Sequence, residues 1–342
     1  MKRNILNMVL SVLVGGLFLW LALRNLDINE VWAYIRQMNY GWIAPYFLVA
    51  VLSFWFRSER WKLLMEADRP GLRKANLFTG VLLGYAVNYA IPRAGELSRT
   101  IFLAKKENMS SSAVLGTVVL ERIIDLLAML LMLILIIFFV VSDRATMDAL
   151  FGPQLYLLLD ELRSPLIFTG ILLAGLASLF LLWQAVRYIL DKRRRDLDAG
   201  LESAGLRKIV YTFTDGITSV RKLRRWPLFL AYTAGIWISY GLLTYIPFYA
   251  FGMAEQFGLG LREAFSVMVI STIGVVLPSP GGIGTYHWFV SQSLYVLYAV
   301  PAVTGVAFAF ITHIGMFAVV MLVTPAAWFF TLLRKSDSNN TA

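Results

Sequence analysis

The segment Asn88-Tyr-Ala-Ile-Pro92-Arg93-Ala-Gly95-Glu96-Leu-Ser-Arg99 lies within an otherwise hydrophobic part of the chain. It combines a proline–glycine break with three ionisable side chains. Ionisable groups at membrane depth are costly and usually face a protein interior or a polar cavity, which makes them functional candidates. Non-helical backbone at that depth needs cover from protein or water. The segment therefore predicts a polar pathway inside a membrane protein.

The composition supports an all-α polytopic membrane protein. Of the 342 residues, 58% are hydrophobic and 15% are charged, against roughly 45–50% and about 25% in a soluble domain; the mean hydropathy is +0.68. Cysteine is absent, which excludes disulfides and thiolate metal sites, and the two histidines form no HExxH motif. We expect no metal and no cofactor. The net charge of +10 does not indicate nucleic-acid binding, because the basic residues lie beside hydrophobic segments.

Long apolar runs predict about six transmembrane helices. They are Ile5–Leu23, Trp42–Phe56, Ala113–Val141, Pro165–Leu190, Leu228–Phe251 and Ala302–Leu333. Two further hydrophobic regions, Ala75–Ala104 and Ala264–Val300, contain a Pro/Gly break in the middle. Helical arms of about 15 residues reach only ~22 Å, short of the ~30 Å hydrocarbon core. Two re-entrant hairpins therefore fit these regions better than pairs of full spans.

The distribution of Lys and Arg predicts the orientation. With the N-terminus inside, the cytoplasmic connections contain 22 basic residues and the external connections contain 5. The count includes Arg57–Lys74 as a cytoplasmic connection and residues 24–41 as an external one. Such an asymmetry favours cytoplasmic N- and C-termini. Residues 191–227 then form a cytoplasmic basic linker with one or two solvated helices. A second interpretation is that this linker binds anionic lipid headgroups.

A weak internal repeat relates the two breaks. Pro92-x-x-Gly95 matches Pro278-x-x-Gly281, and similar Ala-Val-x-Gly segments follow each break. Under the predicted orientation, the single membrane domain (residues 1–342) divides into inverted halves, residues 1–141 and residues 164–333. Inverted repeats with broken helices in matching positions are typical of secondary transporters, whose substrate site lies at the repeat interface.

The first break offers a site for an anion. A helix that restarts there exposes free N–H groups and a positive dipole end. Arg93 and Arg99 add planar guanidinium groups that suit phosphate, and Glu96 can pair with either arginine or with a ligand's ammonium group. Alternatively, the three charges neutralise one another and only fasten the hairpin.

A second charged group follows on the next hydrophobic run. Glu121 and Asp125 are four residues apart and share one helix face, whereas Arg122 is offset. We expect the acids to pair with Arg93 and Arg99, giving three cations and three anions in balance. That network is either a structural fastener or a gate in which an incoming phosphate replaces a carboxylate.

The second break supplies flexible backbone and polar side chains. Its glycines allow close backbone approach and exposed N–H groups, and two polar rings follow them. Its candidate residues are Pro278, Pro280, Gly281, Gly282, Gly284, Tyr286 and His287. The alternative is a tight turn with a hydrogen-bonded core histidine. His313 stands alone in an apolar run, where a packing role is expected.

In these motifs the chain resembles a known family, the flippase domain of lysylphosphatidylglycerol synthases and its stand-alone relatives. The motifs are Arg57-x-x-Arg60-Trp61, Asn88-x-x-x-Pro92-x-x-x-Glu96-x-x-Arg99, Glu121-Arg122-x-x-Asp125 and Pro278-x-Pro280-Gly-Gly-x-Gly284. They follow the family's order and spacing over essentially the whole chain, although the family often has an acid at the position of His287. The resemblance implies a bacterial inner-membrane protein that moves lipid without an aminoacyltransferase domain.

These observations predict a lipid flippase, not an enzyme, that moves a phosphate-bearing lipid between leaflets by alternating access. Its partners would be membrane lipids with anionic or phosphate-bearing headgroups. The resemblance also leaves room for a homo-oligomer and for a separate lipid-synthesising partner enzyme. Two alternatives remain open: an enzyme acting on a lipid-linked substrate, for which Asp27 and Glu30 are the available external acids, and a structural membrane subunit.

The absence of cysteine makes the orientation directly testable with single introduced cysteines. An impermeant maleimide added outside intact cells should label Pro153→Cys and Gly258→Cys but not Ser203→Cys, which should react only after permeabilisation. External labelling at position 203 would contradict both the orientation and the inverted repeat.

Overall fold

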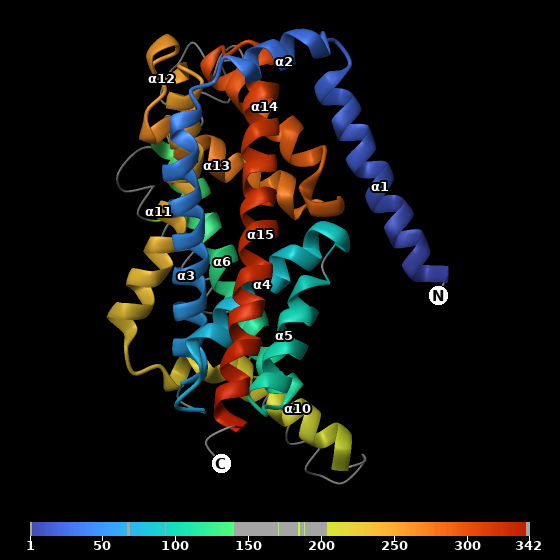
Figure 1. The fold of residues 1–342 in the computed structure, drawn as a ribbon, viewed down its shortest axis with the longest axis vertical. Helices are drawn as coiled ribbons and strands as arrows, with labels where there is room; N and C mark the ends of the chain where they lie inside the picture. Colours follow the sequence, from blue (N-terminus) through green and yellow to red (C-terminus); the bar gives the residue numbers. More distant parts are fainter. Residues whose placement is uncertain are drawn as a thin grey trace.

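The computed structural model describes residues 2–66, 69–92, 94–139 and 204–339, together with Gly170, Gln184 and Tyr188. Over these residues the chain consists of helices and connecting turns, and none of them is in a strand (Figure 1). The predicted all-α class is confirmed. The apolar run Pro165–Leu190 and the external connection at residues 142–163 lie outside the described residues, apart from those single positions.

The N-terminal part contains a long first helix, two broken or bent regions and a long sixth helix. Its elements are α1 (Lys2–Leu23), α2 (Ile28–Arg36), η1 (Tyr40–Trp42), α3 (Ile43–Met65), α4 (Lys74–Ala90), α5 (Gly95–Lys106) and α6 (Ser111–Phe139). The predicted first break is real, because α4 ends and α5 begins on either side of Pro92.

The C-terminal part is arranged around its longest helix. Its elements are α10 (Ala204–Ile217), η2 (Thr218–Lys222), α11 (Trp226–Ala250), α12 (Met253–Gln256), α13 (Leu261–Val276), η3 (Pro280–Gly282), α14 (Thr285–Tyr298) and α15 (Ala302–Asn339). Figure 1 shows α15 running along the long axis with α3, α4 and α14 beside it, and these three helices contact α15. The second predicted break is also real.

Two of the described helices, α11 and α15 over Ala302–Leu333, are long and apolar enough to cross a membrane. A third candidate is the pair formed by Leu10–Leu23 and α2, which is bent by 81°. The predicted runs within α3 and α6 are helical. Charged residues follow the run in α3 and interrupt it in α6. About six spans, two re-entrant hairpins and the inverted halves remain predictions.

The helix α3 corrects one predicted boundary. The apolar run was expected to end at Phe56, with Arg57 starting a cytoplasmic connection, but α3 continues to Met65. Arg57 and Arg60 are buried, because carboxylates on α6 meet them. Without these two, the predicted cytoplasmic side still has 20 basic residues against 5, which favours the same orientation.

Residues 24–41 were expected to be a plain external connection, yet they contain α2. Asp27 accepts a hydrogen bond from the N–H of Asn29 at 2.8 Å and so caps this helix. Val31 and Ile35 on its inner face are buried against a cluster that also includes Phe248 and Phe308. Amphipathic spacing therefore docks α2 onto the helical body.

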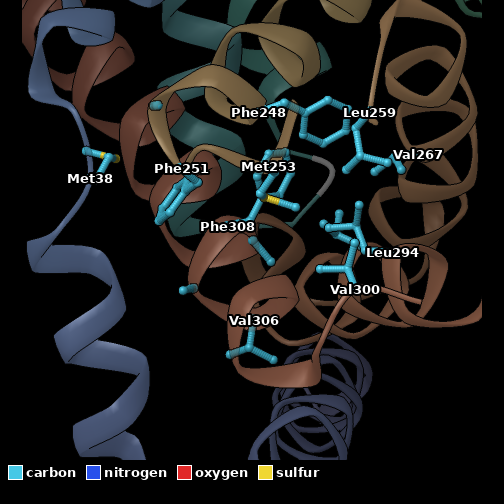
Figure 2. Packing of buried hydrophobic residues seen from close by; sticks show 14 of the residues in the cluster. Met38, Phe248, Phe251, Met253, Leu259, Val267, Leu294, Val300, Val306 and Phe308 are labelled. Carbon is cyan, nitrogen blue, oxygen red and sulfur yellow. The ribbon is translucent and has the colours of Figure 1, made fainter. Parts of the chain in front are cut away.

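Two apolar clusters hold the body together. One joins α2, α11, α13, α14 and α15, and Figure 2 shows Phe248, Met253 and Phe308 at its centre. The rings of Phe248 and Phe308 lie 5.2 Å apart, a separation typical of favourable aromatic pairs. The other joins α3, α4, α5, α6, α11 and α15 and includes Trp61. The second cluster forms the wall around the buried charges described below.

The first break is fixed by one glycine and one asparagine. The N–H of Gly95 donates to Asn88 Oδ1 at 2.8 Å, which supplies the start of α5 with a partner from the end of α4. A Cβ atom at position 95 would overlap the carbonyl oxygen of Gly84 and would lie 2.6 Å from Asn88 Cγ. The motif Asn88-x-x-x-Pro92-x-x-Gly95 thus specifies a tight hairpin.

The second break lies against the first. Gly281 and Gly284 have φ angles of +56° and +82°, a region that favours glycine. A Cβ at Gly281 would lie 2.7 Å from the ring of Tyr89 at the end of α4, and one at Gly284 would overlap the carbonyl oxygen of Gly15 on α1. The two breaks therefore meet midway along the molecule, as Figure 1 shows.

The described part of the predicted basic linker is helical but is not a freely solvated helix. A Cβ at Gly116 on α6 would overlap the carbonyl oxygen of Phe213, and one at Gly216 on α10 would overlap that of Ala113. Ser112 and Thr212 are hydrogen-bonded across the same contact. The small residues dock α10 directly on α6, which the sequence analysis did not predict.

We expect Gly95→Ala to lower the free energy of unfolding by about 1–3 kcal/mol, because the methyl group overlaps α4 backbone that cannot move away easily. Gly80→Ala on α4 is the matched control, since its methyl would meet side-chain atoms at an ordinary 3.5 Å, and its effect should stay within about 1 kcal/mol. Thermal unfolding in nanodiscs measures both. Equal melting temperatures would contradict the tight contact.

Candidate functional site

Arg60 is the centre of a buried ionic site. Its side chain is fully buried, and its Nη2 lies 2.7 Å from Asp125 Oδ1 and 3.3 Å from Glu121 Oε1. Because α3 extends past its apolar run, the guanidinium reaches the face of α6 that contains both acids. Isolated buried charge is strongly unfavourable, so the two carboxylates are what allow this arginine to lie here.

Arg57, one turn earlier on α3, contacts the other side of Asp125. Its Nη1 lies 2.9 Å from Asp125 Oδ2, and its Nη2 donates to the hydroxyl of Tyr240 at 3.0 Å. The hydroxyls of Tyr240 and Tyr85 are 3.1 Å apart. A hydrogen-bonded chain therefore links α6 through α3 to α11 and α4.

Arg99 reaches the same acids from α5. Its Nη2 lies 2.7 Å from Glu121 Oε2, but the two groups lack the alignment of a hydrogen bond. Its guanidinium lies 4.7 Å from the centre of the Trp61 ring, a cation–π distance. Trp61 is fixed in turn, since its Nε1 donates to Thr117 Oγ1 at 2.9 Å. Arg99 is thus positioned chiefly by stacking and charge.

Arg122 extends the site outward. Its side chain is 42% exposed and lies 3.6 Å from Asp125 Oδ2. For Glu96 the sequence left open a pair with Arg93, a pair with Arg99 or contact with a ligand's ammonium group. No ion pair joins it to another described residue, and it lines a pocket with Arg122. Arg93 lies outside the described residues. We use the name arginine cluster for six residues: Arg57, Arg60, Arg99, Glu121, Arg122 and Asp125.

The arginine cluster contains more cations than anions. The predicted balance of three cations and three anions included Arg93, which lies outside the described residues, and stays a prediction. Four arginines share two carboxylates. Several buried donor atoms also have no hydrogen-bond partner within the described part of the chain, among them Arg57 Nε, Arg60 Nε and Arg60 Nη1. Buried polar groups normally find partners. The excess positive charge and the free donors give this site the character of an anion receptor.

Sequence reasoning missed Arg57 and Arg60 as site residues. They were assigned to a connection because the apolar run ends at Phe56. A signal was nevertheless present: Arg57-x-x-Arg60 follows helical spacing, so both side chains project from one face of a continued helix. The expected pairing of Arg99 with an acid of the Glu121 motif is confirmed.

The second break forms a separate polar cluster. Gly284 N–H donates to His287 Nδ1 at 3.3 Å, and the hydroxyls of Tyr286 and Thr312 lie 3.0 Å apart. The rings of His287 and His313 are 4.9 Å apart, which agrees with the packing role expected for His313. Its ring also lies 5.9 Å from that of Tyr89. The cluster joins the second break to α4.

The other candidate residues of the second break, Gly282, Pro280 and Pro278, belong to its turn. Gly282 has a φ angle of +82°. The ring of Pro280 lies near Gly15 of α1, and Pro278 lies partly buried in the turn between α13 and η3. Among the described residues, no group of three or more His, Cys, Asp or Glu side chains could hold a metal ion.

The helical fold, the apolar helices and a buried ionic site define an integral membrane protein with an internal polar centre. The chain belongs to the family of the lysylphosphatidylglycerol synthase TM region, whose model matches residues 8–324. The resemblance found in the sequence motifs is confirmed.

A relative of this chain is a UPF0104 membrane protein of Methanocaldococcus jannaschii. The two are 24% identical over 128 residues, which cover 36% of this chain and 38% of the relative. The match therefore spans well under half of either protein. No solved structure matches the chain.

The burial of Glu121 predicts a structural cost when its charge is removed. We expect Glu121→Gln to lower the free energy of unfolding by about 3 kcal/mol, because Arg60 and Arg99 lose a buried counter-charge. Glu59→Gln is the control: Glu59 is also buried, but it pairs at 3.0 Å with the exposed Lys74, and such a pair contributes at most about 1 kcal/mol. Thermal unfolding of both variants provides the measurement, and equal shifts would show that Glu121 is solvated.

Proposed function

We propose that this protein is a lipid flippase that moves a phosphate-bearing lipid between the leaflets of a membrane. The observation that carries the proposal is the unbalanced arginine cluster, in which four arginines share two carboxylates. A phosphate group would supply both the missing negative charge and several acceptor oxygens. Arginine is the side chain best suited to recognise it, because its planar fork binds two oxygens at once.

Carboxylates within the cluster provide a way to release as well as to bind phosphate. Without a ligand, Asp125 binds Arg57 and Arg60, and Glu121 contacts Arg60 and Arg99. A headgroup phosphate would replace Asp125 or Glu121 at an arginine, and the displaced acid would remain beside another one. Each exchange replaces one ion pair by a similar one, so charge can move through the interior without an isolated buried ion. The acyl chains would stay in lipid.

The two Pro/Gly breaks are the proposed moving elements. They meet at Tyr89 and Gly281, and α4 and α5, which flank the first break, surround the arginine cluster together with α3 and α6. Non-helical backbone can change its φ and ψ angles without breaking the hydrogen bonds of a continuous helix. We assign them to two re-entrant hairpins among about six spans, in two inverted halves that open alternately to either side.

This proposal places the protein in a bacterial inner membrane with both termini in the cytoplasm, and a lipid-synthesising enzyme as a functional partner. We propose that the protein transports the lipid and does not catalyse group transfer on a lipid-linked substrate. One observation supports that choice: Asp27, an external acid that a lipid-linked glycosyl transfer could use, caps α2 through Asn29.

Reconstituted vesicles test the proposal. The protein should accelerate movement of a fluorescent phosphatidylglycerol to the outer leaflet, where dithionite reduces the dye. It should not accelerate a phosphate-free glycolipid with the same fluorescent tail. Equal acceleration of both lipids would show a non-selective membrane defect, and no acceleration of either would contradict transport.

Within that assay, Arg99→Lys should slow phosphatidylglycerol movement by about tenfold, because lysine provides a point charge and no planar surface to stack on Trp61. Arg36→Lys is the matched control, since Arg36 also lies over a tryptophan, Trp32, at 5.4 Å but on the exposed face of α2. Full activity of Arg99→Lys would mean that only its charge matters.

A further inference from the structure

The side of the molecule formed by α5 and α6 has two kinds of exposed side chain. Most are apolar, and they include Leu97, Ile101, Leu126 and Leu130. In an integral membrane protein such a surface is covered by lipid chains. One exposed side chain on it is the cation Arg122. An arginine among lipid-covered leucines is costly unless a partner meets its charge.

A pocket of ≈ 230 Å³ opens at this position between α5 and α6. Two charged and five aliphatic residues line it: Glu96, Leu115, Val118, Val119, Arg122, Ile123 and Leu126. The aliphatic walls suit the apolar part of a lipid next to its headgroup. The exposed wall of the pocket is apolar, and the charges of Glu96 and Arg122 beside it cancel, so an anionic group would be bound there only weakly.

The side chain of Asp125 connects Arg122 at the pocket with the buried arginines. Arg122 lies 3.6 Å from Asp125 Oδ2, and the same oxygen lies 2.9 Å from Arg57 Nη1. Asp125 is 15% exposed, intermediate between the outer arginine and the buried ones. The three buried arginines outnumber the two acids, whereas the pocket is neutral. Positive charge therefore increases from the lipid-facing surface toward the arginine cluster.

We infer that this pocket is the lateral entrance for the lipid, with the headgroup phosphate binding first to Arg122 and passing to Arg57 and Arg60 as Asp125 releases them. The acyl chains remain outside, against the exposed Leu97 and Ile101 of α5. The inference rests on the proposed function and adds to it the place and order in which the substrate enters. Weak binding at the entrance favours onward movement, since a tight outer site would trap the lipid.

The cysteine-free chain allows a reversible block of the pocket. Leu126→Cys places a thiol in its wall, and Leu130→Cys places one on the same face of α6, one turn away and outside the lining residues. Each variant is modified in detergent with a bulky aromatic methanethiosulfonate, checked by mass spectrometry, and reconstituted. We expect modification at position 126 to slow phosphatidylglycerol movement at least about tenfold, dithiothreitol to restore it, and modification at position 130 to change it little.

The other outcomes separate this inference from the proposed function. If unmodified variants and wild type move no phosphate lipid, the proposed function fails, and the entrance with it. If they move it and the block at position 126 has no effect, the entrance is overturned and the function stands. Equal loss at positions 126 and 130 also overturns the entrance, because it indicates a general disturbance of α6. A disulfide that joins two copies of the Leu126→Cys variant in vesicles would assign this face to a second copy of the chain and overturn the entrance as well.

Discussion

The structure depends on the need to satisfy a guanidinium that has no access to water. Arg60 is fully buried, and it can lie there only because Glu121 and Asp125 approach it from α6. This requirement fixes the relative position of α3 and α6. It also fixes α5, because Arg99 shares Glu121 and stacks on Trp61 next to Arg60. Three helices are thus aligned by one set of charges, and the apolar clusters pack around them.

The same constraint connects the ionic site to the C-terminal helices. Tyr240 on α11 accepts from Arg57 and lies within hydrogen-bond distance of Tyr85 on α4. Tyr89 is one turn beyond Tyr85 on α4 and touches both Gly281 and His313. A rearrangement of the second break would therefore change the position of α4, and with it the partner that orients Arg57.

Sequence patterns predicted the helical class, both breaks and one of the cluster's ion pairs, because each depends on local chemistry. Proline and glycine interrupt a helix wherever they lie, and acids four residues apart share a face in any helix. The roles of Arg57 and Arg60 could not be obtained in this way. Their burial depends on carboxylates 61 and 65 residues away from Arg60, and an apolar run alone gives no reason to extend α3 past Phe56.

Close contacts between glycines were equally hidden from the sequence. Gly116 and Gly216 permit α10 to lie on α6, and neither glycine is needed for its local backbone angle. Glu96 shows how far a local pattern reaches. Its sequence position allowed a pair with Arg93 or Arg99 or contact with a ligand, and among the described residues it lines the neighbouring pocket with Arg122.

The contact between Gly15 and Gly284 joins the beginning of the chain to its last quarter. Among the helices that α1 contacts are α14 and η3, which are synthesised long after it. At about 5–20 residues per second, α1 would wait in the bilayer for tens of seconds before its docking partner leaves the ribosome. Its exposed Leu13, Leu17 and Trp20 suit that interval, because lipid solvates them without a protein partner. Because α1 precedes α14 by most of the described chain, it can dock on α14 only well after its own synthesis.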